Sequence, residues 1–279
     1  MITDRQTNKL FLADSLPKQQ PKFFRRFEKV LNDCNINFQF LQNTKDIWAV
    51  DFMPVQISKD KFVRFTYNPD YLQSKKYQKT ISDVDSICKA INLTTIKSKL
   101  IVDGGNVSKS TEKVIMCDKV FHENKHIPEK DLIKQLKNLF EVDKLFFVPW
   151  DINDFTGHSD GMVRFIDSDT VLINDYSKEN PEFQRCFRMS LHNAGLDWIE
   201  LPYNPSINDT AYESAEGLYL NYLQMKQAVI VPTFKTKYDD KALKVLEQVF
   251  KGQTIAAVDS NEVAKHGGIL NCITWNISA

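Results

Sequence analysis

The chain has 279 residues, and its 36 lysines and arginines equal its 36 aspartates and glutamates in number. Hydrophobic residues make up 42% and charged residues 26%, which is typical of a folded globular protein and excludes long disorder, a collagen or a coiled coil. Because nucleic-acid-binding domains gather lysine and arginine and usually have a high pI, the even charge balance predicts no nucleic-acid partner.

The sequence carries no signal for a membrane or a secretory route. No stretch approaches the apolar length of a membrane span, and residues 1–20 lack the apolar run of a signal peptide. The five cysteines are odd in number and widely separated, which fits neither a disulfide framework nor a CxxC metal site. We therefore expect a cytoplasmic protein without a membrane partner.

Helical and strand patterns alternate from one end of the chain to the other. Apolar residues at three- and four-residue spacing predict helices at 22–33, 82–91, 129–139, 181–194 and 239–250. Segments rich in Val, Ile and Phe predict strands at 55–67, 113–121, 145–148, 162–173, 228–234 and 269–277, with a hairpin turn at 166–171. Since no Gly-, Ser- or Pro-rich linker divides the pattern, we expect one α/β domain over residues 1–279.

The placement of glycine points to an internal repeat. Gly104, Gly157, Gly217 and Gly267 follow one another at intervals of about 50 to 60 residues. Five units of this length would fill the chain, and a period near 50 is typical of a propeller-like array of β-rich units. Nine glycines can be aligned in several ways, so from spacing alone the array is a hypothesis.

Residues 156–161, which read TGHSDG, hold the sharpest cluster of polar side chains. His158 lies two residues from Asp160, and the flanking glycines let the backbone approach a ligand, as an acid/base site requires. The alternative is a solvated turn that caps the following strand. A second segment, 102–106, runs from an apolar strand end into Asp103 and a tight turn, and its alternative is a common Asp-Gly turn.

Two further segments place a carboxylate and a thiol among apolar neighbours. Asp51 lies within 48–54, where its burial needs a cationic ligand or a histidine nearby; a cap before Pro54 is the alternative. Cys272 follows paired glycines in 266–274, and a single buried cysteine is usually inert. A thiol, a histidine and three aspartates together nevertheless make a set of nucleophile, base and binding carboxylates.

Residues 122–126 spell H-E-x-x-H, the signature of zinc proteases. That motif needs a helix that brings both histidines onto one face. Here the segment follows a predicted strand and meets Pro128 two residues later, so we expect no such helix and no metal site.

Taken in chain order, four segments resemble the motifs of a known enzyme family. They read WAVDFMP at 48–54, VDGGN at 102–106, TGHSDG at 156–161 and HGGILNCIT at 266–274. Their order and rough spacing resemble the agmatine deiminase and bacterial-type peptidylarginine deiminase family, in the guanidine-modifying pentein superfamily. Supporting segments at 120–124, 219–222, 229–232 and 256–259 look similar as well.

The resemblance implies a five-bladed β/α propeller of ββαβ units around a central site, and it assigns roles by position. Cys272 matches the nucleophile, His158 the general acid/base, and Asp103 the carboxylate that orients this histidine. Asp51 and Asp160 match the pair that grips a guanidinium. The implied reaction hydrolyses agmatine to N-carbamoylputrescine and ammonia through a covalent thiouronium on the cysteine, with no metal or organic cofactor.

Around this set, the resemblance places Trp48, Gly268 and Asn271 at the guanidine substrate, with Trp48 as one wall of the pocket. Residues 203–216, which are polar and contain proline, are the candidate for a loop over the pocket. The alternatives are a core tryptophan and a solvated loop. A homodimer is the default expectation for oligomeric state.

Two departures from the family pattern bear on the substrate more than on the fold or the reaction class. Family members usually carry Arg where this chain has Val50, and agmatine deiminases usually have Glu where it has Asp103. The chain is also shorter than typical agmatine deiminases, which is consistent with the loss of substrate-covering loops. Deimination of free or peptidyl arginine, amidino transfer, a catalytically idle binding protein and an unrelated Cys-His hydrolase therefore stay open.

Overall fold

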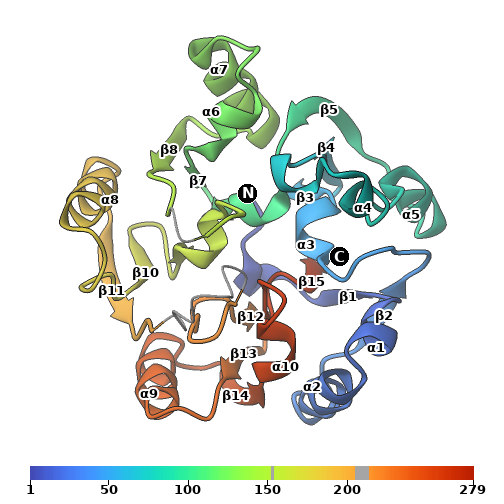
Figure 1. The fold of residues 1–279 in the computed structure, drawn as a ribbon, viewed down its shortest axis with the longest axis vertical. Helices are drawn as coiled ribbons and strands as arrows, with labels where there is room; N and C mark the ends of the chain where they lie inside the picture. The colour runs from blue at the N-terminus through green and yellow to red at the C-terminus, as the bar shows by residue number, and fades with distance from the viewer. Residues whose placement is uncertain (152–153, 205–213) are drawn as a thin grey trace.

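The computed structural model describes residues 1–151, 154–204 and 214–279. Within this part of the chain, the strands form five three-stranded sheets, which stand around a central axis with the longer helices outside them (Figure 1). In each sheet the middle strand runs antiparallel to one neighbour and parallel to the other. This arrangement confirms the array of five units that the glycine spacing predicts.

The five sheets are β15 (Thr274–Ile277), β1 (Lys9–Ala13) and β2 (Phe38–Leu41); β3 (Val55–Ser58), β4 (Lys61–Thr66) and β5 (Ile96–Ile101); β6 (Ser108–Lys109), β7 (Lys113–Cys117) and β8 (Lys144–Val148); β9 (Val163–Phe165), β10 (Thr170–Asn174) and β11 (Asp197–Leu201); and β12 (Leu223–Gln224), β13 (Ala228–Thr233) and β14 (Thr254–Asp259). The helices are η1 (Asp4–Gln6), α1 (Leu16–Gln19), α2 (Pro21–Asp33), α3 (Ala49–Phe52), η2 (Asp70–Leu72), α4 (Lys75–Gln78), α5 (Val84–Ala90), η3 (Gly104–Asn106), α6 (Lys119–Glu123), α7 (Glu129–Phe140), η4 (Ser159–Gly161), α8 (Pro181–Asn193), α9 (Asp239–Val249) and α10 (Asn261–Ala264).

The two ends of the chain close the ring of sheets. The last strand, β15, pairs antiparallel with the first, β1, so that Phe11 lies opposite Trp275. Because β1 also pairs in parallel with β2, it is the middle strand of its sheet, and four of its five residues are buried. Trp275 also ties this sheet to the next one, since its Nε1 donates a hydrogen bond of 2.9 Å to the backbone oxygen of Pro54.

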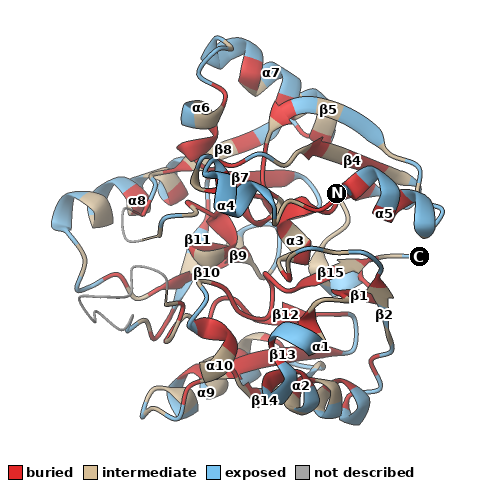
Figure 2. Cartoon of the chain, turned by 45° about the vertical axis from the view of Figure 1, so that its right-hand side comes forward, coloured by how far each residue is buried: buried red, intermediate tan, exposed pale blue. Residues whose placement is uncertain are grey.

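The apolar faces of the long helices pack toward the sheets. In α2, Phe23, Phe27 and Leu31 recur every four residues and are fully buried, and in α7 Leu132 and Leu136 repeat the pattern. Burial of each such side chain is worth roughly 1.5–3 kcal/mol. Figure 2 shows the result, with buried residues on the strands and exposed residues along the outer faces of the helices.

The connections between sheets bring distant residues to the centre of the ring. Each sheet is preceded by a lead-in segment, and these segments are residues 46–54, 102–107, 154–162, 214–222 and 266–273. Three of them contain single helical turns, α3, η3 and η4, and η3 contacts both of the others. The four motifs that the sequence singles out lie on four of these lead-in segments.

The five predicted helices are confirmed as α2, α5, α7, α8 and α9, with their ends shifted by one or two residues. The predicted strand 55–67 is the hairpin of β3 and β4, and the predicted turn at 166–171 joins β9 to β10. The pattern does not predict the middle strand β1, the outer strands β2, β11 and β14 or the two-residue strands β6 and β12, and it predicts only the end of β5, before Asp103.

Two strand predictions are wrong in part. Residues 119–121 belong to α6 rather than to a strand; Val120 is apolar because this helix packs it into the core against the neighbouring sheet. Residues 269–273 form a turn, in which the backbone N–H of Ile273 bonds to the oxygen of Ile269. Their apolar side chains are buried in the largest core cluster. Because this turn is buried, its amino-acid composition resembles that of a strand.

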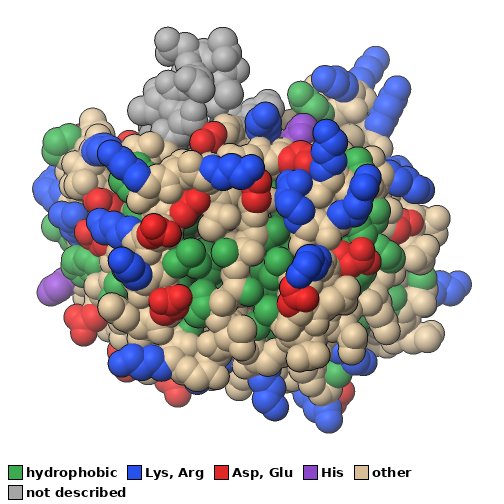
Figure 3. Space-filling model, turned by 90° about the horizontal axis from the view of Figure 1, so that it is seen from below, with side chains coloured by type: hydrophobic (Ala, Val, Ile, Leu, Met, Phe, Trp, Pro, Cys, Tyr) green, Lys and Arg blue, Asp and Glu red, His purple; other side chains and the backbone are tan. Residues whose placement is uncertain are grey.

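The outer surface mixes charges of both signs. On the face seen in Figure 3, Lys and Arg side chains are interspersed with Asp and Glu. Across the three described stretches, no helix is both long and apolar enough to pass through a membrane.

Candidate active site

A cavity of about 500 Å³ lies at the centre of the ring, between the lead-in segments. Its walls include four residues that the sequence singles out, namely Asp51, His158, Asp160 and Cys272. All four side chains are buried. Three separate lead-in segments supply them, so the fold brings together residues that are far apart in the chain.

His158 lies between two carboxylates. Its Nε2 is 3.0 Å from Oδ2 of Asp103, and its Nδ1 is 3.5 Å from Oδ1 of Asp51. Burial lowers the pKa of His158, but the charges of Asp51, Asp103 and Asp160 outweigh burial and raise it to about 10. The imidazole is therefore protonated at neutral pH, and it can serve as a proton donor.

Asp103 is held by a second partner besides the histidine. Its Oδ2 accepts a hydrogen bond of 2.8 Å from the hydroxyl of Tyr71. Burial and the charge of Asp103 raise the pKa of Tyr71, so the phenol keeps its proton and remains a donor. Although Asp103 is one methylene shorter than the usual glutamate, it reaches His158, and this departure leaves the pairing intact.

Cys272 lies in the turn before β15, and Asn221 holds it there. Nδ2 of Asn221 donates a hydrogen bond of 3.2 Å to Sγ of Cys272, and its Oδ1 accepts one of 3.0 Å from the backbone N–H of Asn271. Burial and the charges of Asp160 and Asp51 raise the pKa of the Cys272 thiol well above its ordinary value. A cation bound beside the aspartates would offset their charges and stabilise the thiolate.

Asn271 supports the second carboxylate of the cavity. Its Nδ2 donates a hydrogen bond of 2.6 Å to Oδ2 of Asp160. Burial raises the pKa of Asp160, whereas the charges of His158 and Arg164 oppose the rise. Asn271, predicted to lie at the substrate, therefore contacts the carboxylate that faces the cavity.

Arg164 supplies a buried positive charge that the first motif lacks. It lines a smaller cavity of about 270 Å³, which Val50 and Asp160 also border. Its guanidinium is 2.6 Å from Oδ2 of Asp4 and donates a hydrogen bond of 3.2 Å to the backbone oxygen of Tyr222. The chain thus keeps a cation near Asp160 even though Val50 stands where related proteins usually have arginine.

Trp48 and Gly268 form one wall of the larger cavity. A Cβ at Gly268 would lie 2.5 Å from the Trp48 ring and 2.9 Å from Cβ of Cys272, so a larger residue would displace one of them. Trp48 is only partly buried and also packs against the largest core cluster. It therefore combines the wall and core roles that the sequence leaves open.

The predicted covering loop at 203–216 is placed only at its two ends. Tyr203, Ser214 and Glu216 border the cavity, while residues 205–213 lie outside the described part of the chain.

The H-E-x-x-H segment does not form a helix that carries both histidines. α6 ends at Glu123, so His126 lies beyond it, and Nε2 of His122 instead faces Asp70 at 4.0 Å. Among the residues that the structure describes, no three His, Cys, Asp or Glu side chains are grouped to hold a metal ion.

Residues 5–277 match the Porphyromonas-type peptidyl-arginine deiminase family. The chain belongs to this family. An agmatine deiminase of Pseudomonas aeruginosa is 23% identical to this deiminase-family chain over 207 residues, which are 62% of the chain and 54% of that enzyme. A curated relative from Mycoplasma mycoides subsp. mycoides is 23% identical over 219 residues. The chain spans 60% of the length of that relative.

Solved structures share the fold of this deiminase-family protein over nearly its whole length. An agmatine deiminase of C. jejuni has a TM-score of 0.82 at 20% identity, covering 100% of this chain and 95% of that one. A DDAH from Pseudomonas aeruginosa has a TM-score of 0.60 at 11% identity, covering 98% and 100%. These likenesses confirm the five-bladed pentein propeller that the motifs implied.

Three residues at the site were not predicted to lie there. Asn221 belongs to a segment that resembles the family, and it lies 51 residues before Cys272, close to the repeat length; this spacing was the available signal. Tyr71 and Arg164 carry no such signal. They reach the site through η2 and β9, whose positions depend on the folded ring.

Proposed function

We propose that this deiminase-family protein hydrolyses a guanidine through a covalent bond to Cys272, and that agmatine is its best candidate substrate. The observation that carries the proposal is the grouping of a thiol, a histidine and two buried carboxylates, Asp51 and Asp160, around one cavity. A guanidinium suits this site because it is planar, always charged and rich in N–H donors.

Binding prepares the nucleophile. Asp51 and Asp160 accept hydrogen bonds from the guanidinium, whose charge offsets the repulsion between the two carboxylates. The same charge stabilises the thiolate of Cys272, so the thiol releases its proton to solvent when the substrate is in place. The sulfur then forms a bond to the central carbon of the guanidinium.

His158 carries the protons in both halves of the reaction. As the bond from carbon to one amino group breaks, the imidazolium gives that nitrogen a proton, so ammonia leaves and a thiouronium remains on Cys272. The neutral imidazole then takes a proton from water, and the water oxygen bonds to the same carbon. The C–S bond breaks as the hydroxyl proton passes to the sulfur, which releases the ureido product and restores the thiol and the imidazolium. Asp103 orients His158 and stabilises its charged form.

The charges of the cavity favour a substrate with a second positive group. The described residues that line the cavity include no lysine or arginine, whereas Asp46, Asp154 and Glu216 add carboxylates to its walls. Agmatine carries only an ammonium group at its far end, whereas arginine carries a carboxylate beside its ammonium group, and like charges in contact cost several kcal/mol. We expect agmatine to be preferred over free arginine by on the order of 100-fold in kcat/KM, which is about 3 kcal/mol.

Related proteins support the choice of reaction through the shared fold. A cysteine-to-serine variant of the C. jejuni agmatine deiminase was solved with substrate bound, at 21% identity to this chain. The DDAH structure contains citrulline, which is a ureido compound.

The test is a substrate panel. Purified protein is incubated with agmatine, free arginine and arginine blocked at both ends, and ammonia and ureido product are measured. Blocked arginine is included because it lacks the free carboxylate that the acidic residues of the cavity are expected to repel. Ureido product from agmatine supports the proposal, and folded protein that releases neither product from any of the three contradicts it. An amidino product on an added primary amine would instead identify a transferase.

A further inference from the structure

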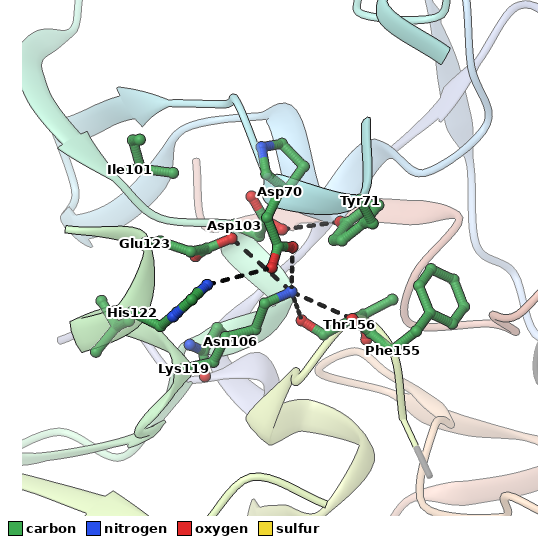
Figure 4. Close-up of polar contacts among 12 residues, drawn as sticks. Asp70, Tyr71, Ile101, Asp103, Asn106, Lys119, His122, Glu123, Phe155 and Thr156 are labelled. Atoms are coloured by element: carbon green, nitrogen blue, oxygen red, sulfur yellow. Dashed lines mark hydrogen bonds and ion pairs between the residues drawn. The ribbon is translucent and has the colours of Figure 1, made fainter. Parts of the chain in front are cut away.

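Lys119 is a buried cation behind the candidate site. It begins α6, and its side chain is 1% exposed. Its Nζ donates hydrogen bonds of 3.2 and 2.8 Å to the backbone oxygens of Phe155 and Thr156, and it lies 2.8 Å from Oδ1 of Asp70 (Figure 4). Burying an unpaired ammonium costs several kcal/mol. The three oxygen partners offset this cost and stabilise the charged lysine in its buried position.

Two aromatic rings and a glycine complete the surroundings of Lys119. Its Nζ lies 4.7 Å from the ring centroid of Tyr71 and 5.2 Å from that of Trp150. Its aliphatic stem passes close to Gly157, where a Cβ would lie 2.6 Å from Cδ of the lysine, and the φ of this glycine is +62°. The backbone directly before His158 therefore rests on the lysine side chain.

These contacts connect the two segments that hold the His158–Asp103 pair. One segment, η2, carries Tyr71, whose hydroxyl donates a hydrogen bond to Asp103. The other is the lead-in segment 154–162, which carries His158 and is braced by a hydrogen bond of 3.2 Å from the His158 backbone N–H to Asp154. Lys119 comes from a third element, α6, and it contacts both segments.

We propose that Lys119 is a positioning residue for the deiminase reaction, which keeps His158 and Asp103 at working distance without touching the substrate. Lys119 is not among the described residues that line the cavity, so its effect is indirect. The inference rests on the proposed function, in which His158 transfers the protons. Since proton transfer depends on the position of the imidazole, whereas binding depends on Asp51 and Asp160, loss of Lys119 lowers kcat more than it raises KM.

Two lysine variants test this role. Lys119→Met keeps the length of the stem and removes the charge. Lys113→Met is the matched control, because Lys113 is also buried, pairs with Asp169 at 3.0 Å, and lies outside the cavity. We expect Lys119→Met to lower kcat about 100-fold and to change KM by less than about threefold. Amide hydrogen exchange of residues 154–158 should become faster in Lys119→Met alone.

A third variant keeps the test independent of folding. Asp70 is partly exposed, and Asp70→Asn removes the nearer of the two charged partners of Lys119, the other being Glu123 at 3.9 Å, while the lysine itself stays. We expect this variant to fold and to lower kcat about 10-fold. If Lys119→Met does not fold, the kinetics of Asp70→Asn test the role of Lys119 instead. An unchanged kcat in Asp70→Asn would then overturn the assignment of Lys119 as a positioning residue.

The remaining outcomes also separate the two proposals. A kcat of Lys119→Met equal to that of the wild type, a fall that Lys113→Met matches, or a rise of KM alone overturns the role of Lys119. If the wild-type protein turns over no guanidine, the proposed function fails by itself. Hydrogen exchange then still tests Lys119, and equal exchange of residues 154–158 in both lysine variants overturns it.

Discussion

Asn221 donates a hydrogen bond of 3.2 Å from Nδ2 to Sγ of Cys272, and both side chains are buried. The oxygen of the same amide accepts bonds of 3.0 and 3.4 Å from the backbone N–H groups of Asn271 and Cys272. One amide therefore fixes the turn that presents the thiol and supplies a donor to the sulfur, which matters most when the sulfur is charged.

Asn221→Ala removes this donor. We expect kcat to fall about 100-fold, as for the loss of one donor at a developing charge. The apparent pKa of Cys272, followed by the pH dependence of alkylation with a haloacetamidine, should rise further, because the hydrogen bond from Asn221 opposes the rise in the folded protein. Asn276→Ala removes an amide that bonds Thr7 outside the larger cavity and should leave both quantities unchanged. An unaltered alkylation profile in Asn221→Ala would contradict the assignment.

The Asp103–His158 contact predicts opposite tolerances for two substitutions. Asp103→Asn keeps the shape but loses the charge that favours the imidazolium, so kcat should fall about 10⁴-fold. Asp103→Glu keeps the charge but adds a methylene where 3.0 Å already separates the two side chains, and a fall of about 10-fold is expected from the displaced imidazole. Steady-state kinetics on agmatine measure both; the account fails if Asp103→Asn is the more active of the two.

The two carboxylates that we propose bind the guanidinium, Asp51 and Asp160, predict the acid side of the pH dependence. Burial raises the pKa of both Asp51 and Asp160, so they take up protons at a higher pH than ordinary aspartates. Protonation removes the negative charges that hold the guanidinium, and KM should rise as the pH falls through this raised range. Asp160→Asn should raise KM at least about 30-fold at neutral pH. A KM that stays constant down to the pH of an ordinary carboxyl group would contradict this.

Glu123 predicts a second feature in the pH profile. Its Oε1 and Oδ1 of Asp103 are buried without a hydrogen-bond partner among the described residues. Burial and the charge of Asp103 raise the pKa of Glu123 to about 7, while Lys119 and His158 oppose the rise and Asp70 adds to it. Above this pH a further negative charge makes the neutral imidazole of His158 a stronger base for the step in which it takes a proton from water. We expect kcat to increase through an inflection near pH 7 that Glu123→Gln lacks.

A distant carboxylate provides the control for that profile. Glu141 is exposed and pairs with Lys61, so Glu141→Gln should keep the inflection near pH 7. An inflection that persists in Glu123→Gln would assign it to another group.

Much of the fold could be predicted from local patterns. The long helices carry their apolar residues on one face, and the glycine intervals reflect four of the five lead-in segments, since residues 46–54 contain no glycine. The predictions failed where an apolar segment packs into the core with a backbone conformation other than a strand. Val120 lies in a helix and Ile269 lies in a turn, and both side chains are buried in the core. The apolar residues around each of them have the same composition as a buried strand, so the sequence pattern does not distinguish the two cases.

The residues of the candidate site also fall into those that the sequence predicts and those that only the folded structure reveals. Asp51, His158, Asp160 and Cys272 each lie in a motif that could be found in the sequence, and the structure brings them to one cavity. Tyr71, Arg164 and Lys119 act through elements that approach the site only in the closed ring. Although Lys119 precedes the family-like segment 120–124 and Arg164 follows the motif at 156–161, neither residue is part of a motif that predicts its approach to the site.

The central claim is that Cys272 forms a covalent bond to the substrate carbon. The most direct measurement is mass spectrometry of protein quenched with acid during turnover of agmatine, with the adduct mapped to a peptide. We predict an adduct of agmatine less ammonia on the peptide that contains Cys272. We also predict no adduct and no ureido product with Cys272→Ala, and full activity with Cys34→Ala, whose cysteine is buried in the core away from the cavity. Ureido product formed by Cys272→Ala, or an adduct on a different residue, would contradict the account.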